Sequence, residues 1–221
     1  KILQFRHQEE THRAPLCRKI TMNLLTIFAS FALMCLVSQV SADEEPEETV
    51  AEILIELSGD NDFDNNKYDY DLFLKGLELC GFVDELSDRR SVYTVFAPRD
   101  KAFFRFAKDL GYPGQGNYDE EAIWDFFVNY NYNNNADAMS VLKSFLLYHV
   151  SPGYLDSVDF EDVETVTTYI NETITPRGLD PVILVDVAES LPNPRLTDPF
   201  DLIASNGIIH TIKYILVPFP L

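Results

Sequence analysis

Carboxylate side chains gather in residues 60–71, which read Asp-Asn-Asp-Phe-Asp-Asn-Asn-Lys-Tyr-Asp-Tyr-Asp. Asp60, Asp62, Asp64 and Asp71 occupy positions 1, 3, 5 and 12 of this segment, which lies between two predicted helices. Oxygen ligands at this spacing bind Ca²⁺ in EF-hand loops, where position 6 is glycine and position 12 is the longer glutamate. Here position 6 is Asn, position 8 is Lys and position 12 is Asp. We interpret the segment as an acidic loop and keep a calcium site formed by the four aspartates as the alternative hypothesis.

Of the four histidines, the two that follow residue 42, His149 and His210, have the chemistry of a general base, but both fall on apolar faces. His149 follows Leu142, Phe145 and Leu146 at helical spacing, and His210 shares one face of a predicted strand with isoleucines. Because they lie on apolar faces, we expect both imidazoles to be buried and neutral. A general base must reach its substrate, so this placement argues against a catalytic role. Ser151 is close to His149 in sequence, yet there is no nucleophile elbow, zinc-protease motif or phosphate-binding glycine loop. We predict a non-catalytic protein without a cofactor, apart from the calcium alternative, and keep a secreted hydrolase as a further alternative.

The elements that position these residues follow from hydrophobic spacing. A buried strand over residues 92–96 runs directly into a helix after Pro98, whose fixed φ suits a first helical turn. Cys80 lies on an apolar stripe and is predicted to be a buried hydrophobe, with pairing between chains as the alternative. We also predict helices at 49–57, at 72–86 with an interruption at Gly81, from about 119, and at 137–149. Strands are predicted at 165–170 and at 182–187, the second of them buried on both faces. A last strand, with alternating burial, is predicted after the tight-turn pair Asn206-Gly207.

The chain has 221 residues, and the first 42 are predicted to lie outside the folded domain. Residues 22–42 begin at a methionine, continue as an apolar run and end in small residues, which is typical of a secretory signal peptide. A membrane anchor is the alternative for this run. We expect residues 1–21 to be translated upstream sequence or a mis-called start, 43–48 an acidic leader, and 49–219 a single domain.

The charge balance is strongly acidic, with a net charge of −19 for the whole chain. Residues 43–221 carry 12 of its 17 basic and 34 of its 36 acidic residues, a net charge of −22. Such a surface repels phosphate backbones and anionic membranes, so we expect no nucleic-acid partner and no membrane insertion of the mature form. The last residues do not show the polar spacer and hydrophobic tail of a lipid-anchor signal.

Three segments, in this order, resemble the fasciclin (FAS1) domain family. They are Tyr-Thr-Val-Phe-Ala-Pro-x-Asp-x-Ala-Phe at 93–103, Leu-Leu-Tyr-His-Val-Ser-Pro-Gly at 146–153 and Ser-Asn-Gly-Ile-Ile-His-x-Ile at 205–212. The resemblance extends over roughly residues 50–218, nearly the whole predicted mature chain. The motif residues that it singles out are Thr94, Phe96, Ala97, Pro98, Asp100, Ala102, Phe103, Tyr148, His149, Asn206, Gly207 and His210.

The resemblance implies an α+β fold, a compact β-sandwich wedge flanked by several α-helices. It also implies a secreted or cell-surface adhesion and extracellular-matrix module, with extracellular proteins or glycans as partners. We expect the motif residues to build the scaffold, with the first and third segments as neighbouring strands. Arg99 stands where the family usually has a hydroxyl residue that caps the helix, so we expect Asp100 to cap instead, one residue later. The integrin-binding sequences of some animal members have their only counterpart in Tyr148 and His149, both in the predicted core.

One glycosylation sequon is present after residue 42, Asn171-Glu172-Thr173. In a secreted eukaryotic protein we expect Asn171 to carry a glycan where its loop is exposed.

Overall fold

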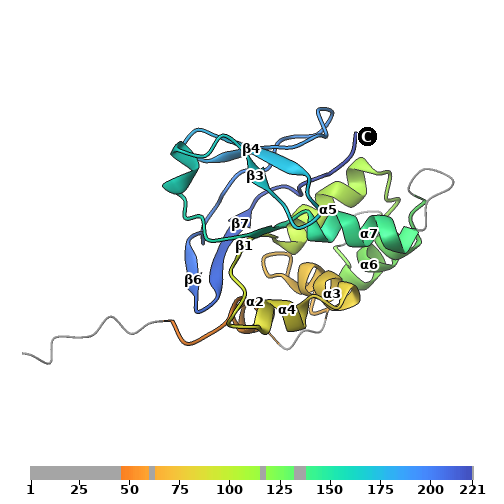
Figure 1. Cartoon of the computed structure of the whole chain (residues 1–221). Coiled ribbons are helices and arrows are strands. Elements are labelled where there is room, and N and C mark those ends of the chain that lie inside the picture. The colour runs from red at the N-terminus through yellow and green to blue at the C-terminus, as the bar shows by residue number, and fades with distance from the viewer. Residues whose placement is uncertain (1–45, 60–62, 115–117, 132–137, 221) are drawn as a thin grey trace, which may run out of the picture. The chain divides into compact units, whose positions relative to one another are not determined.

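The computed structural model describes residues 46–59, 63–114, 118–131 and 138–220, which form the domain shown in Figure 1. The predicted upstream segment 1–21, the signal peptide 22–42 and part of the leader lie outside the described residues. The helices are α2 (Val50–Leu57), α3 (Asp71–Cys80), α4 (Val83–Ser87), α5 (Asp100–Asp109), α6 (Glu120–Asn129), α7 (Ala138–Leu147) and the short 3₁₀ helix η1 (Asp159–Glu161). The strands are β1 (Tyr93–Pro98), β2 (Val150–Pro152), β3 (Val166–Thr167), β4 (Thr173–Arg177), β5 (Ile183–Val185), β6 (Leu202–Ala204) and β7 (Gly207–Ile212).

Two sheets and a group of helices make up the fold. The larger sheet has the strand order β2-β1-β7-β6, and the smaller has the order β3-β4-β5. β1 and β7 are parallel, with Tyr93 opposite Gly207 and Phe96 opposite His210. This pairing confirms the prediction that the first and third sequence motifs form neighbouring strands. The predicted α+β class is also confirmed.

β1 and β7 are buried on both faces because they separate two hydrophobic cores. Val95 and Ala97 of β1 face the core under the helices, whereas Phe96 faces the core between the sheets. In β7, Ile209 and Ile212 divide in the same way. The prediction of alternating burial along the last strand is therefore wrong, because helices cover one face of the sheet and the second sheet covers the other.

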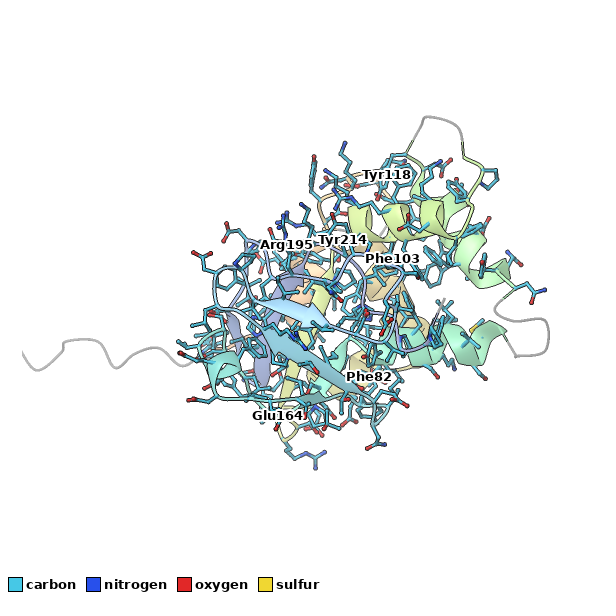
Figure 2. The ribbon with its side chains drawn as sticks, turned by 90° about the horizontal axis from the view of Figure 1, so that it is seen from above. Phe82, Phe103, Tyr118, Glu164, Arg195 and Tyr214 are labelled. Carbon is cyan, nitrogen blue, oxygen red and sulfur yellow. The ribbon has the colours of Figure 1, made fainter. Side chains whose placement is uncertain are left out.

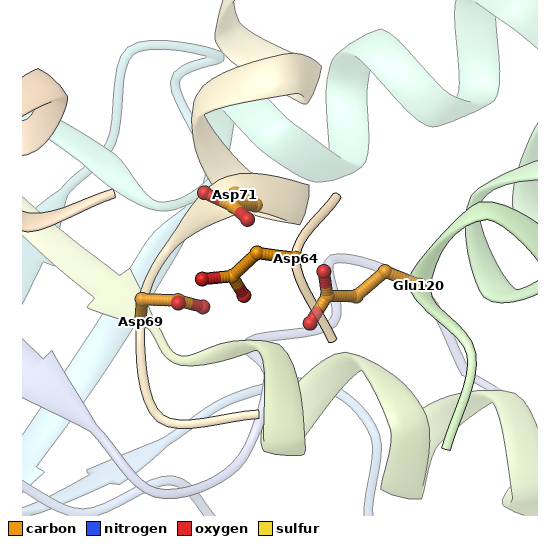
Figure 3. Close-up of side chains that lie close together, drawn as sticks. All are labelled: Asp64, Asp69, Asp71 and Glu120. Carbon is orange, nitrogen blue, oxygen red and sulfur yellow. The ribbon is translucent and has the colours of Figure 1, made fainter. Parts of the chain in front are cut away.

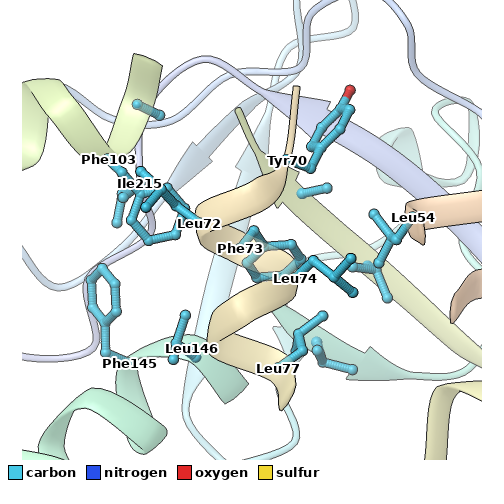
Figure 4. Close-up of a cluster of buried hydrophobic side chains, with 14 of the residues drawn as sticks. Leu54, Tyr70, Leu72, Phe73, Leu74, Leu77, Phe103, Phe145, Leu146 and Ile215 are labelled. Atoms are coloured by element: carbon cyan, nitrogen blue, oxygen red, sulfur yellow. The ribbon is translucent and has the colours of Figure 1, made fainter. Parts of the chain in front are cut away.

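The helical core is organised around α3, as Figure 4 shows. Side chains of α2, α5 and α7 surround Phe73 and Leu77, both of which are fully buried. The helix predicted over residues 72–86 is two helices, because Gly81 adopts φ +68° and ends α3 with its N–H bonded to carbonyls of the last turn. Cys80, predicted to be buried, is only half-buried, and this burial raises the pKa of its thiol to about 11.

The second sheet is shorter and more exposed than the sequence predicted. β3 contains only two residues of the predicted strand 165–170. In β5 Leu184 is buried and Ile183 exposed, so two-sided burial of residues 182–187 is wrong. The predicted helix 137–149 is described from Ala138 and ends at Leu147, because the chain enters β2 at Val150.

The helix start after Pro98 differs from the prediction. Arg99 occupies the N-cap position and Asp100 is the first helical residue, so the prediction that Asp100 caps α5 is wrong. The free N–H groups of the first turn find other acceptors, since Asp100 N–H donates to the Asp69 carbonyl at 3.1 Å and Lys101 N–H to the Lys67 carbonyl at 2.9 Å. Backbone carbonyls of the loop before α3 therefore cap the start of α5, and these bonds hold the loop against α5.

Candidate functional site

Four carboxylates converge where α3 and α6 begin, as Figure 3 shows. Asp64 and Asp69 come from the loop before α3, Asp71 is the first residue of α3, and Glu120 is the first residue of α6. One carboxylate oxygen from each residue lies within 4.8 Å of the corresponding oxygens of the others. Asp69, Asp71 and Glu120 are buried, whereas Asp64 is exposed, so the cluster reaches the surface through Asp64. We call these four residues the carboxylate cluster.

A reciprocal pair of hydrogen bonds holds α6 against the loop. Asn65 N–H donates to Glu120 Oε2 at 2.8 Å, and Glu120 N–H donates to Asn65 Oδ1 at 3.2 Å. Asn65 has φ +66°, the left-handed conformation that asparagine tolerates better than most residues. It stands at position 6 of the acidic segment, where an EF-hand loop needs glycine for the same backbone geometry. The local backbone thus directs Glu120 toward the aspartates.

The carboxylate cluster is electrostatically strained. Burial, and then the charges of Asp69, Glu120 and Asp64, raise the pKa of Asp71 to about 7. Burial is also the main cause of the raised pKa of both Asp69 and Glu120. Among the described residues, neither oxygen of Asp71 has a hydrogen-bond partner, and one oxygen each of Asp69 and Glu120 also lacks one. Buried charges without partners cost free energy, which a bound proton or a bound cation offsets.

Asp100, a residue of the first sequence motif, lies beside the carboxylate cluster but differs from it in protonation state. Its Oδ1 accepts the Leu72 N–H at 3.0 Å. Burial, and then the neighbouring carboxylate of Asp69, raise the pKa of Asp100 to about 10, so its carboxyl is protonated at neutral pH. Asp100 is therefore a neutral part of the scaffold that joins α5 to α3.

The carboxylate cluster offers only oxygen ligands, the set that Ca²⁺ and Mg²⁺ prefer. Oxygens that bind one Ca²⁺ at ~2.4 Å can lie at most about 4.8 Å apart, so the observed separations are compatible with a shared ion. Of the four predicted ligands, the structure brings Asp64 and Asp71 together, while Asp60 and Asp62 lie outside the described residues. The sequence prediction missed Asp69 and Glu120. Glu120 is 49 positions from Asp71, and its acidic place in a first helical turn indicated only a favourable interaction with the helix dipole.

Both histidines are fully buried, which confirms the prediction. His149 Nδ1 donates to the Phe145 carbonyl at 3.0 Å, and its Nε2 accepts the Leu216 N–H at 3.0 Å. Burial lowers the pKa of His149 to about 4. His210 Nε2 donates to the Leu155 carbonyl at 2.8 Å. Burial also lowers the pKa of His210 and outweighs the opposing carboxylate of Asp201, 3.3 Å from Nδ1, so the ring is neutral and this contact is not a salt bridge.

The remaining polar motif residues also bind the protein itself. The hydroxyl of Thr94 donates to the Gly153 carbonyl at 2.9 Å, and that of Tyr148 donates to the Thr173 carbonyl at 2.8 Å. The hydroxyl of Ser151, considered for catalysis, donates to the Thr167 carbonyl at 2.7 Å. These side chains build the scaffold.

Asn206 connects three parts of the fold. Its Oδ1 accepts the Val50 N–H at 2.8 Å, and its Nδ2 donates to the carbonyls of Leu86 at 2.8 Å and Asp88 at 3.2 Å. The hairpin turn itself is formed by residues 205–206, one position earlier than the predicted pair, and β7 begins at Gly207. Gly207 has φ +155°, and a Cβ there would lie 2.0 Å from the carbonyl oxygen of Tyr93. Only glycine fits this position.

The fold and these contacts define an α+β module of the FAS1 type, in which the characteristic residues are structural. The model of the fasciclin domain family matches residues 69–218, and the chain belongs to this family. A solved structure of a FAS1 domain pair from the insect cell adhesion molecule fasciclin I is similar in fold, with a TM-score of 0.52 and 18% sequence identity. The match covers 78% of this chain and 51% of that one, so this chain spans about half of its length. No curated protein sequence matches the chain.

In the part of the chain that the structure describes, no helix combines the length and the apolar character needed to cross a membrane.

Proposed function

We propose that the protein is a secreted, non-catalytic adhesion or extracellular-matrix module whose partners are extracellular proteins or glycans. The observation that carries this proposal is the fasciclin domain over residues 69–218. Modules of this family act in adhesion, and the motif residues of this chain are used inside the fold. Contacts with partners therefore fall to the loops and exposed faces of a single domain, for which we propose the bounds 49–219.

The surroundings of the histidines support a non-catalytic role. His149 and His210 have no exposed surface, and both nitrogens of each ring face groups of the protein. A hydrolase of the kind considered as an alternative needs one of these histidines in a cleft beside a nucleophile.

Expression of the full chain in a eukaryotic secretory host tests both the export and the adhesion. The product in the medium should begin at Asp43, as measured by mass spectrometry of the intact protein. Cells, matrix proteins and glycans should adhere to a surface coated with this product more than to an inert protein at equal density. A chain retained in the membrane would contradict secretion, and adhesion no greater than on the inert surface would contradict the module's role.

A second candidate function is a calcium-dependent binding module, and the carboxylate cluster favours it. Three buried carboxylates with unpartnered oxygens face an exposed fourth, and all four meet the separation that one ion requires. We propose Asp64, Asp69, Asp71 and Glu120 as ligands, with Asp60 and Asp62 as further ligands from the same segment. An ion here would join the start of α3 to the start of α6.

Thermal unfolding with and without Ca²⁺ tests this candidate. At a hundred times its Kd, the ion should stabilise the fold by about 2.7 kcal/mol, which raises Tm by roughly 5–10 °C in a domain of this size. Asp71→Asn and Glu120→Gln should abolish this rise, and Asp71→Asn should raise Tm without calcium because it removes a buried charge. Glu161→Gln, at an exposed site in η1, is the matched control. An unchanged Tm at millimolar Ca²⁺ would contradict the calcium site and leave protons as the groups that neutralise the carboxylate cluster. If Ca²⁺ raises Tm but a chelator does not reduce adhesion, the calcium site exists but is not needed for adhesion.

A further inference from the structure

A pocket of about 230 Å³ has the opposite charge to the rest of the chain. Only 12 basic residues stand among the 46 charged residues of 43–221, yet five of the 12 line this pocket and no acidic residue does. We call the pocket, with the cations Arg99, Lys101, Arg105, Arg195 and Lys213, the basic pocket. A random choice of charged neighbours would be mostly acidic in this chain. The gathering of five cations is therefore a specific feature of the fold.

The basic pocket is assembled from three parts of the chain. Arg99, Lys101 and Arg105 belong to the first turns of α5 and its N-cap, Lys213 follows β7, and Arg195 lies in the loop before β6. Arg105 Nη1 donates to the Lys213 carbonyl at 3.2 Å, and Lys213 N–H donates to the Arg195 carbonyl at 3.0 Å. Figure 2 labels Arg195 and, near it in that view, Tyr214, the residue that follows Lys213. Backbone contacts thus hold the cations around one hollow.

The charges of the basic pocket are not neutralised by carboxylates. Within the described ranges, none of the five cations forms a salt bridge, whereas Lys75 and Arg90, elsewhere on the surface, do. Arg99 Nη2 donates to the Asp198 carbonyl at 2.9 Å, but its Nε is buried without a partner.

Aromatic rings restrict the cations of this region. The Lys101 ammonium lies 5.1 Å from the centroid of the Tyr68 ring, and the Arg105 guanidinium lies 5.2 Å from that of Tyr214. Cation–π contacts of this kind hold a charge in place without neutralising it. The basic pocket is therefore partly ordered before any ligand arrives.

The chemistry of the pocket selects an oxyanion. Guanidinium and ammonium groups only donate hydrogen bonds, and several of them around a hollow match a group with several acceptor oxygens. The volume is below the roughly 300–1,000 Å³ of pockets for drug-sized ligands, so one charged group and part of its carrier fit. The acidic surface around the pocket repels an extended polyanion such as a nucleic acid.

We propose that the basic pocket binds a sulfate ester of an extracellular glycan. The oxyanion preference rests on the pocket itself, whereas the choice of a sulfated sugar as its carrier rests on the proposed extracellular function. A sulfate ester presents three terminal oxygens to the cations and keeps a single negative charge, which limits repulsion by the acidic surface. The sugar ring then lies against the rim, where Tyr68 and Thr197 line the pocket.

Calorimetric titration with a sulfated disaccharide, its unsulfated form and inorganic sulfate tests the proposal. The full chain should bind the sulfated disaccharide saturably and the unsulfated form at least tenfold more weakly, and increasing salt should weaken binding. Lys101→Gln with Arg195→Gln should raise the Kd at least tenfold because it removes two of the five cations of the basic pocket. The fold should be retained, since these two side chains donate none of the hydrogen bonds between segments described above. Lys75→Gln with Lys143→Gln removes two cations outside the pocket and should leave the Kd unchanged.

Three results would overturn the proposal in distinguishable ways. Equal affinity of the pocket variant and the control variant would remove the pocket as the site. Inorganic sulfate binding that depends on Lys101 and Arg195, without tighter binding of the sulfated disaccharide, would overturn the glycan and leave an ion site only. Tighter binding of an acidic peptide or a phosphate monoester than of the sulfated disaccharide would assign a different ligand. Thermal unfolding of each variant checks that the fold is intact, and adhesion, measured separately, tests the proposed function.

Discussion

Replacement of Asn206 by alanine should be among the most destabilising single polar substitutions in this domain. The side chain is 1% exposed and makes three hydrogen bonds, which join the start of α2, the end of α4 and the turn before β7. Asn206→Ala leaves the buried Val50 N–H and the Leu86 carbonyl without their partner. Each orphaned buried group costs about 1–3 kcal/mol, so we expect a loss of roughly 2–5 kcal/mol in the free energy of unfolding. This is a large fraction of the ~5–15 kcal/mol that stabilises a typical domain.

Asn206→Asp separates the accepting and donating roles of the side chain. Aspartate keeps an oxygen for the Val50 N–H but turns the donor toward Leu86 and Asp88 into an acceptor that faces two carbonyls. It should therefore be destabilising as well, by repulsion at the α4 end alone. Asn193→Ala, in an exposed loop, is the control and should change stability by at most about 0.5 kcal/mol.

Urea unfolding followed by far-ultraviolet circular dichroism measures these differences, since most of the helices pack against the core that Asn206 supports. Equal m-values would show that the variants change stability and not the extent of unfolding. A loss below about 1 kcal/mol for Asn206→Ala, or none for Asn206→Asp, would refute the reasoning, because the three bonds would then contribute only the net value of one exposed contact.

Three further predictions concern two scaffold positions, Gly207 and His149, and the glycosylation sequon at Asn171. Gly207→Ala should destabilise the domain by more than about 3 kcal/mol or prevent folding, because its Cβ would meet the Tyr93 carbonyl, and the urea midpoint or soluble yield measures this. His149 should remain neutral with the proton on Nδ1 down to about pH 4, seen in its ring nitrogen shifts. Since its unfolded pKa is ~6.5, its contribution to stability is complete above pH 6.5 and is lost as the pH falls to about 4. Asn171 is exposed and has φ +64°, and it should carry a glycan in protein from a eukaryotic secretory host. Mass spectrometry that finds the peptide containing Asn171 unmodified would contradict this.

Local signals in the sequence predicted the frame of the domain well. The first helix, predicted from residue 49, begins after Thr49, which caps it, and the runs predicted as the strands before Pro98 and after Asn206 form β1 and β7. These elements depend on residues close in sequence or on hydrophobic runs long enough to specify a buried strand, whereas the pairing of β1 with β7 was expected from the family resemblance. Short strands such as β6, with three residues, give no such pattern and were missed.

Tertiary contacts explain the parts that the sequence could not predict. Asn206 reaches a backbone N–H 156 positions away, although its type and its glycine neighbour indicated only a turn. Glu120 becomes a buried member of the carboxylate cluster because Asn65 binds both its backbone and its side chain. The basic pocket needs residues from α5, β7 and a loop between strands, and no one-dimensional charge pattern brings them together.

The carboxylate cluster and the basic pocket meet at two short segments, residues 67–71, which hold Asp69 and Asp71 of the cluster, and residues 99–101, which hold Arg99 and Lys101 of the pocket. The bonds from Asp100 N–H to the Asp69 carbonyl and from Lys101 N–H to the Lys67 carbonyl fix the register of the two segments. This register turns the acidic side chains toward the start of α3 and the basic side chains of α5 toward the pocket. Among the described residues, no salt bridge joins the carboxylate cluster to the five cations of the basic pocket. The buried carboxylates and the unpaired cations therefore both remain available to ions from solution, which is why we assign a cation to the one and an oxyanion to the other.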